Sequence, residues 1–243
     1  MSIEISIVIP TLQEAKLLPD FLARFDHSVL ERHGTELIVS DGGSEDDTVA
    51  IAERWGAPVV RHEGTHRQTI AEGRNAGAAI ARGRILVFLN ADVRLNDVDR
   101  FLATVPLVLA REGVVAATAE VQVFPEEERL SDRAFHFVHN AYVRFLNLIG
   151  EGMGRGECQV LTRAVFASVG GYNPHMVAGE DYDLFRRVRK LGRIVMLPDV
   201  VVYESPRRFR KYGYTHIVWG WTRNALAVIF RNSSSSEEWE AVR

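Results

Sequence analysis

The stretch RILVFLNADVRL, residues 84–95, decides the fold class of this chain. Its apolar run, residues 85–89, leads directly into the polar sequence Asn90-Ala91-Asp92. A short continuous apolar run with polar ends is typical of a strand buried on both faces, as strands of parallel sheets are. Because open α/β sheets bind ligands beyond the carboxyl ends of their strands, this stretch predicts a buried strand with a ligand site at residues 90–92.

The flanking sequence alternates strand and helix patterns. Strands are predicted at ISIVIP (5–10), ELIVSD (36–41), APVVRH (57–62) and RILVFLN (84–90). Helices are predicted between them, one of them at the small-residue stretch 69–83. The pairs Thr11/Glu14 and Ser44/Asp47 have the spacing of helix capping boxes. This order predicts an α/β fold with a mostly parallel central sheet flanked by helices.

The second half of the chain follows a different pattern. It shows helical stretches at 101–113, 129–149 and 179–192, and strands at 114–124, 158–162, 193–198 and 200–205. Residues 150–156 are rich in glycine, which favours a mobile functional loop. We expect one domain over residues 1–232, with a nucleotide-binding half (about 1–95) and an acceptor half (96–232). The fold is expected to have a smaller acceptor-side region beside the central sheet. Residues 233–243 form a polar tail.

Composition excludes several classes of protein. The 243 residues are 47% hydrophobic and 25% charged, and the net charge of −3 gives no basic excess for nucleic acid. The single cysteine, Cys158, cannot form an intrachain disulfide. The N-terminus lacks the basic region of a signal peptide, and no apolar run reaches the ~18 residues of a membrane span. We expect a cytoplasmic protein, with peripheral membrane contact as the alternative.

Carboxylates recur where the predicted strands and helices meet. Asp41 and Asp92 follow predicted parallel strands, so they are expected at one edge of the sheet, and Glu180-Asp181 opens a late helix. A carboxylate at such an edge can accept hydrogen bonds from a ribose or a base, or bind a divalent cation together with substrate phosphates. Taken alone, each of them fits a turn or a helix cap better, because Asp is common there. Together they favour a functional site.

Five motifs in this order resemble those of glycosyltransferase family 2, which has the GT-A (Rossmann-like) fold. They are SIVIPTLQEA, IVSDGGSEDDT, GRNAGAAIARGRILVFLNADV, VGGYN and GEDYDLFRRVRKLG, and they run from residue 6 to about residue 192. The later SPRRFRKYGY resembles the ending of small soluble bacterial members. The resemblance implies an enzyme that moves a sugar from a nucleotide-sugar donor to an acceptor, with Mg²⁺ or Mn²⁺ and inversion at the anomeric carbon.

The resemblance also implies roles for single residues. Asp181, beside Glu180, matches the catalytic base, and Asp92 matches the Asp that binds the metal ion. The residues implied in nucleotide-sugar binding are Pro10, Thr11, Gln13, Glu14, Asp41, Arg74, Asn75, Asn90, Ala91 and Asp92. Arg207 and Arg208 are candidates for a bidentate contact to the donor diphosphate, with a solvated basic face as the alternative.

Two residues depart from the family pattern. Gln13 replaces the usual Asn of the first motif, and Asn90 replaces the first Asp of the DxD motif. Asn90 can donate to or accept from a ribose hydroxyl but brings no charge to a metal ion. It is the one feature that favours the alternative of a nucleotide-sugar binding protein that has lost transfer.

Other enzyme classes fit the sequence less well. The first strand is not followed by the G-x-G-x-x-G of dinucleotide-dependent oxidoreductases, nor by the Gly-rich basic loop of sugar-1-phosphate nucleotidyltransferases. UDP is the favoured donor nucleotide, and GDP-mannose is the alternative. The acceptor is open, with a lipid-linked phosphate among the candidates. The aromatic segment around Trp219 and Trp221 favours core packing, with a membrane or a second subunit as alternative partners.

Overall fold

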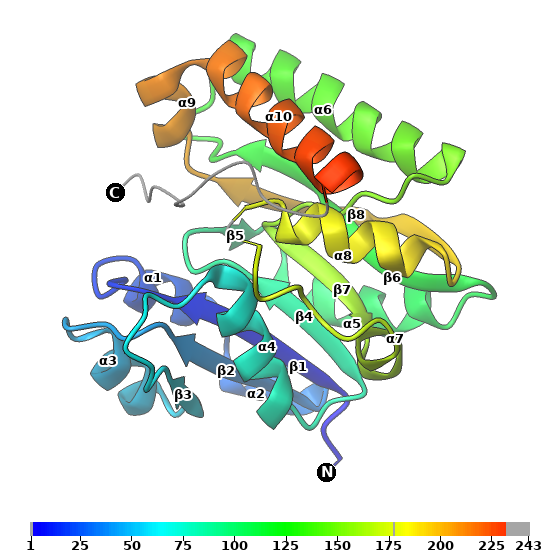
Figure 1. The fold of residues 1–243 in the computed structure, drawn as a ribbon. Coiled ribbons are helices and arrows are strands. Elements are labelled where there is room, and N and C mark those ends of the chain that lie inside the picture. Colours follow the sequence, from blue (N-terminus) through cyan, green and yellow to red (C-terminus); the bar gives the residue numbers. More distant parts are fainter. Residues whose placement is uncertain (1, 177, 232–243) are drawn as a thin grey trace.

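The computed structural model describes residues 2–176 and 178–231, so the expected polar tail (233–243) lies outside the described residues. Within them, eight strands form one sheet in the order β3-β2-β1-β4-β7-β6-β8-β5 (Figure 1). The predicted nucleotide half supplies four parallel strands: β1 (Ile5–Thr11), β2 (Thr35–Asp41), β3 (Val59–Arg61) and β4 (Ile85–Leu89). The predicted parallel arrangement is therefore confirmed, and β4 is fully buried as its apolar run implies.

The second half extends the same sheet with mixed directions. It contributes β5 (Arg94–Leu95), β6 (Val114–Val123), β7 (Cys158–Thr162) and β8 (Arg193–Glu204). Strand β7 is antiparallel to both β4 and β6, and its register sets Cys158 opposite Leu89. The two short strands expected at 193–198 and 200–205 are instead one strand, β8, which pairs in parallel with β6 across two register irregularities.

Helices cover both faces of the sheet (Figure 1). One core lies under α1 (Leu18–Leu22), α2 (His27–Arg32), α3 (Thr48–Trp55) and α5 (Val98–Leu109). The opposite core lies under α4 (Ile70–Ile80), α7 (Arg163–Ser168) and α8 (Glu180–Arg189). Alternate residues of β1 serve the two cores, because successive strand side chains point to opposite faces.

The two predicted capping boxes are wrong. Thr11 is the last residue of β1, and α1 begins only at Leu18. At the start of α3 it is Asp46 that accepts the hydrogen bond from the backbone N–H of Thr48, at 3.0 Å. Both predicted pairs share a spacing with real caps, but the hydroxyls of Thr11 and Ser44 donate instead to the Asp41 carboxylate at the carboxyl edge of the sheet.

Three further helices lie over the β6–β8 part of the sheet: α6 (Leu130–Ile149), α9 (Arg207–Tyr212) and α10 (Tyr214–Arg231). Trp221 of α10 packs on α6, with its ring 5.0 Å from that of His139, as predicted. Trp219 is 68% exposed, so the prediction of core packing is wrong for that residue. In the described part of the chain, no helix combines the length and the apolar composition needed to cross a bilayer.

Candidate active site

Asp41 organises the turn at the carboxyl end of β2. Its carboxylate is 2% exposed and accepts hydrogen bonds from the Thr11 hydroxyl, the Ser44 hydroxyl and the backbone N–H groups of Gly43 and Ser44. Thr11 and Asp41 are direct partners in the β1–β2 register. Because these bonds occupy both carboxylate oxygens, a ribose or base that contacts Asp41 has to replace one of them.

The first predicted motif joins the ends of β1 and β2. The backbone N–H of Gln13 donates to the Ser44 hydroxyl at 2.8 Å, and its side-chain carbonyl accepts from the Asp46 N–H at 3.2 Å. Gln13 has a left-handed backbone with φ of 58°, a conformation that Asn adopts more readily. The Glu14 N–H donates to the Thr48 hydroxyl at 2.8 Å. These contacts fix the loop that begins after Thr11.

Arg74 is the hub of the site. This α4 residue is 1% exposed, and its guanidinium donates to Glu180 Oε1 at 2.8 Å, Asn90 Oδ1 at 3.1 Å and the Gly156 carbonyl at 2.8 Å. The guanidinium also lies 5.3 Å from the centre of the Tyr172 ring. One side chain therefore joins the start of α8, the end of β4 and the Gly-rich loop.

The neighbouring Asn75 has a structural contact instead. Its amide donates to the Tyr172 carbonyl at 2.8 Å and accepts from the Tyr172 N–H at 2.9 Å. Both functional groups of the side chain hold the turn that follows α7. A role for Asn75 in donor binding stays a prediction.

Glu180 and Asp181 lie at the N-terminal end of α8, where the helix dipole favours negative charge. Burial and the charge of Asp181 raise the pKa of Glu180 to about 7, although Arg74 opposes the shift. Burial also raises the pKa of Asp181, again against Arg74. A carboxylate with a raised pKa is a better proton acceptor than an ordinary one, which suits a general base.

The Gly-rich loop approaches α8 closely. A Cβ on Gly154 would lie 2.6 Å from the Phe185 ring, and a Cβ on Gly156 would lie 3.1 Å from Asp181 Oδ2. Close packing therefore explains why glycine occupies these two positions, because a residue without a side chain lets the backbone pass near the carboxylate and the ring. The loop thus forms one wall beside Asp181.

The residues after β4 differ sharply in their surroundings. Ala91 is 6% exposed and its side chain belongs to the core, so its predicted role in nucleotide-sugar binding stays a prediction. Asn90 accepts from Arg74, whereas Asp92 is exposed to solvent. The surrounding protein and the charge of Glu157 raise the pKa of Asp92, and the cations Arg207 and Arg208 oppose this. Asp92 is thus a solvent-exposed carboxylate that interacts electrostatically with Glu157 and with the two arginines.

The sequence reading missed a charged cluster beside Asp92. Arg155 is 3% exposed, and its guanidinium lies 3.1 Å from Glu157 and 3.4 Å from Glu204. It also contacts His139 Nδ1 at 2.9 Å. The sequence shows only that Glu157 directly precedes a predicted strand. It is the register of β7, with Cys158 opposite Leu89, that sets Glu157 opposite Asn90 at the carboxyl end of β4.

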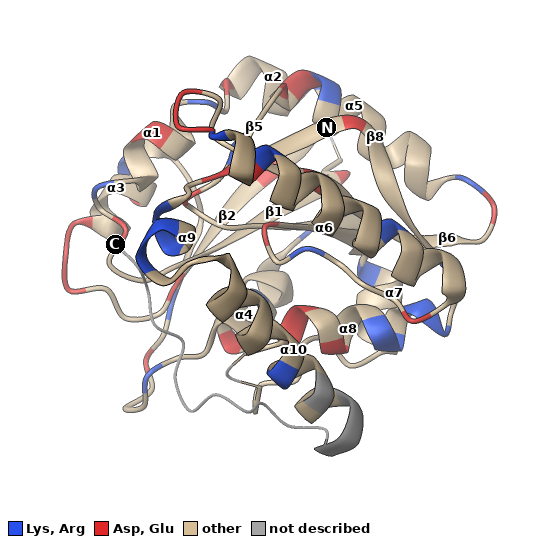
Figure 2. Ribbon diagram, turned by 90° about the horizontal axis from the view of Figure 1, so that it is seen from above, with Lys and Arg blue, Asp and Glu red and all other residues tan. Residues whose placement is uncertain are grey.

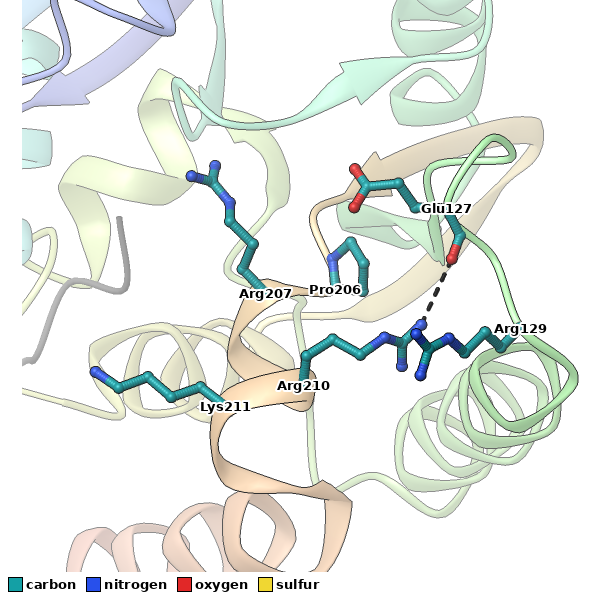
Figure 3. Close-up of a pocket in the computed structure, with 6 residues that line it drawn as sticks. All are labelled: Glu127, Arg129, Pro206, Arg207, Arg210 and Lys211. Carbon is teal, nitrogen blue, oxygen red and sulfur yellow. Dashed lines mark hydrogen bonds between the residues drawn. The ribbon is translucent and has the colours of Figure 1, made fainter.

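Arg207 and Arg208 are the first residues of α9. Basic residues of this helix line a pocket of about 570 Å³ (Figure 3). Its lining residues are Glu127, Arg129, Pro206, Arg207, Arg210 and Lys211. Arg210 is anchored by the buried carboxylate of Asp132 and reaches the Glu127 carbonyl at 3.5 Å. Because the charges of Arg207 and Arg208 act on Asp92, this basic end of α9 lies near the end of β4.

The residues at the end of β4 fit a divalent cation that a substrate helps to hold. Among residues 2–176 and 178–231, no group of three or more His, Cys, Asp or Glu side chains is arranged to hold a metal ion by itself. Mg²⁺ characteristically takes one or two carboxylates together with substrate phosphates and water. Asp92 is an exposed carboxylate whose like-charged neighbour Glu157 favours an added cation.

Known proteins share both sequence and fold with this chain. A 4,4'-diaponeurosporenoate glycosyltransferase of Staphylococcus haemolyticus is 26% identical over 92% of this chain and 61% of its own length. A mannosyltransferase of Pyrobaculum calidifontis in complex with GDP-Man and Mn²⁺ superposes with a TM-score of 0.69 at 21% identity, over 92% of this chain and 61% of its own.

A further structure, glucosyl-3-phosphoglycerate synthase of Mycobacterium tuberculosis with Mn²⁺, UDP and glucosyl-3-phosphoglycerate, has a TM-score of 0.60 at 22% identity, over 93% of this chain and 78% of its own. These neighbours show that the fold is of the GT-A type. The chain spans 37% to 61% of the length of the curated relatives it matches. The profile of Glycosyl transferase family 2 matches residues 6–169, and the chain therefore belongs to this family.

Proposed function

We propose that this protein transfers a sugar from a nucleotide-sugar donor to an acceptor hydroxyl or phosphate by a single inverting displacement. The observation that carries the proposal is the Arg74 hub, which joins the base-bearing end of α8 to the end of β4. A donor diphosphate at the end of β4 would then lie within the same site as Asp181. UDP is the favoured donor nucleotide, and GDP-mannose is the alternative.

In this reaction the bond between the anomeric carbon and the diphosphate breaks as the acceptor oxygen bonds to the opposite face of that carbon. Arg207 and Arg208 would bind the departing diphosphate, because guanidinium groups match phosphate geometry. Asp92 would hold Mg²⁺ or Mn²⁺, which supplies positive charge to the leaving group. A hydroxyl of the donor can form a hydrogen bond with the Asn90 side chain, whose carbonyl oxygen is oriented by the bond from Arg74.

Asp181 would take the proton of an attacking hydroxyl. Its raised pKa suits this task at neutral pH, and Gly156 leaves open the space beside its carboxylate. Glu180 would act as a positioning residue, because its carboxylate is held by Arg74 and is buried. A phosphate acceptor needs no base, so the size of the Asp181 effect also reports on the acceptor class.

The test is Asp181→Asn beside the control Asp20→Asn, an exposed residue of α1. Nucleoside diphosphate release from UDP-glucose and GDP-mannose is measured with a panel of lipid phosphates, hydroxy acids and sugars. Loss of a general base is expected to lower kcat by roughly 10²–10⁴-fold with hydroxyl acceptors. Donor affinity should not change. Wild-type kcat in Asp181→Asn with a hydroxyl acceptor would refute the assignment of Asp181 as base. Donor binding without turnover on any acceptor would favour the binding-protein alternative.

A further inference from the structure

The outer face of α6 is apolar along its whole length and is not covered by the described chain. Its exposed large side chains are Leu130, Phe137, Val138, Tyr142, Phe145, Leu148 and Ile149. They recur at intervals of three, four and seven residues, so they form one continuous stripe on the helix. Phe137 is 75% exposed and Leu148 is 82% exposed. The helix has 20 residues, which gives a stripe about 30 Å long.

Cations flank this stripe at both ends. Near the N-terminal end lie Arg129, Arg133 and the basic residues of α9 (Figure 2). The acidic residues Glu126, Glu127 and Glu128 precede the same end, but Glu126 pairs with Arg94 and Glu128 with Arg133. This leaves Glu127 and Asp132 against Arg129 and the four cations of α9, so the end is basic on balance. Near the C-terminal end, the Arg189 guanidinium approaches Gly150, and the backbone of Arg186 lies beside Gly152. An exposed apolar helix face with basic surroundings is the arrangement that binds at the surface of an anionic bilayer.

A second copy of this chain fits the same face less well. In a symmetric pair with antiparallel α6 helices, the basic N-terminal end of one helix would meet the basic C-terminal end of the other. In a parallel pair, the two basic N-terminal ends would meet. Like charges oppose each other in both arrangements, whereas anionic headgroups complement both ends at once.

We propose that α6 lies flat on an anionic membrane surface, with its apolar stripe among the upper acyl chains and the basic pocket of α9 facing the headgroup phosphates. This places the membrane contact mainly on α6. In the aromatic segment of α10, Trp221 is packed against His139, whereas Trp219 is 68% exposed. The inference does not rest on the proposed transferase activity, because vesicle binding is measured without a donor.

The experiment is flotation of the full chain with vesicles of phosphatidylcholine alone and with vesicles containing phosphatidylglycerol. The variant is Phe137→Asp/Leu148→Asp. The control is Leu107→Asp, which changes a 70% exposed leucine on α5, a helix of the opposite sheet face. We expect wild type and the control to float with the anionic vesicles. The double variant should lose at least about tenfold in partitioning, because two apolar side chains no longer enter the bilayer.

The charge contribution is tested separately with Lys211→Gln, which should weaken binding about fivefold, and with added salt, which should weaken it further. Circular dichroism and gel filtration of each variant show whether it is folded and monomeric. Absence of flotation by the wild type would overturn the proposal. Equal loss in Leu107→Asp would do the same. A dimer in solution that the double variant dissociates would assign the face to a second copy instead.

Discussion

Arg74→Lys tests whether the hub holds the site together. Lysine keeps the positive charge and three N–H donors, but all on one nitrogen. The partners of Arg74 are spread over Nη1, which bonds Glu180, and Nη2, which bonds Asn90 and the Gly156 carbonyl. We expect lysine to keep the bond to Glu180 and to lose the other two. A hydrogen bond to a charged group contributes about 1.5–3 kcal/mol, and this site is buried. We therefore expect the free energy of unfolding to fall by about 3 kcal/mol or more.

The control is Arg84→Lys, because Arg84 also bonds a carboxylate, that of Glu4, with two nitrogens, but its side chain is 59% exposed. An exposed pair contributes up to about 1 kcal/mol, so this variant should lose less than that. Urea unfolding followed by circular dichroism measures both values. At about 2–4 °C per kcal/mol, the Arg74 variant should also melt roughly 10 °C lower. Equal losses of unfolding free energy in the two variants would refute the claim that Arg74 holds the site together.

Two further predictions concern the same site. Gly156→Ala should lower kcat by about tenfold with little change in stability. The new Cβ would lie 3.1 Å from Asp181 Oδ2 and displace that carboxylate by a few tenths of an ångström. The control Gly220→Ala, at a position where a Cβ meets open space, should leave kcat unchanged. Glu180 has a pKa raised from 4.5 to about 7, so the folded state binds its proton more tightly than the unfolded state. The stability it contributes is present below pH 4.5 and is lost as pH rises through 7, which amounts to about 3 kcal/mol. The difference in unfolding free energy between wild type and Glu180→Gln should fall by that amount over this range, and a constant difference would contradict the shift.

Local pattern was enough to predict the carboxyl edge of the sheet. The buried run of β4 and the strand ending at Asp41 identify parallel strands, and parallel strands place Asp41 and the residues after β4 at one edge. The helix at α4 was also predicted from its small residues. The family resemblance implied that Arg74 takes part in nucleotide-sugar binding, but its burial and its bond to Glu180 depend on packing between helices far apart in sequence.

The rest of the site depends on strand order, which local pattern does not contain. Strand β7 inserts between β4 and β6, and only this pairing sets Glu157 opposite Asn90. The Arg155–Glu157–Glu204 cluster joins β8 to that edge, so its members share no motif in the sequence. The false capping box at Thr11 has a similar cause, because its hydroxyl has a tertiary partner in Asp41.

The most direct test of the central claim is calorimetric binding of UDP, GDP and dTDP, with and without Mn²⁺, to wild type and Asp92→Ala. Asp20→Ala, an exposed position on α1, serves as the control. We predict that one nucleotide binds in a Mn²⁺-dependent manner and that Asp92→Ala alone abolishes this dependence. Equal binding with and without the metal would contradict the role of Asp92, and no binding of any nucleotide would contradict the glycosyltransferase proposal itself.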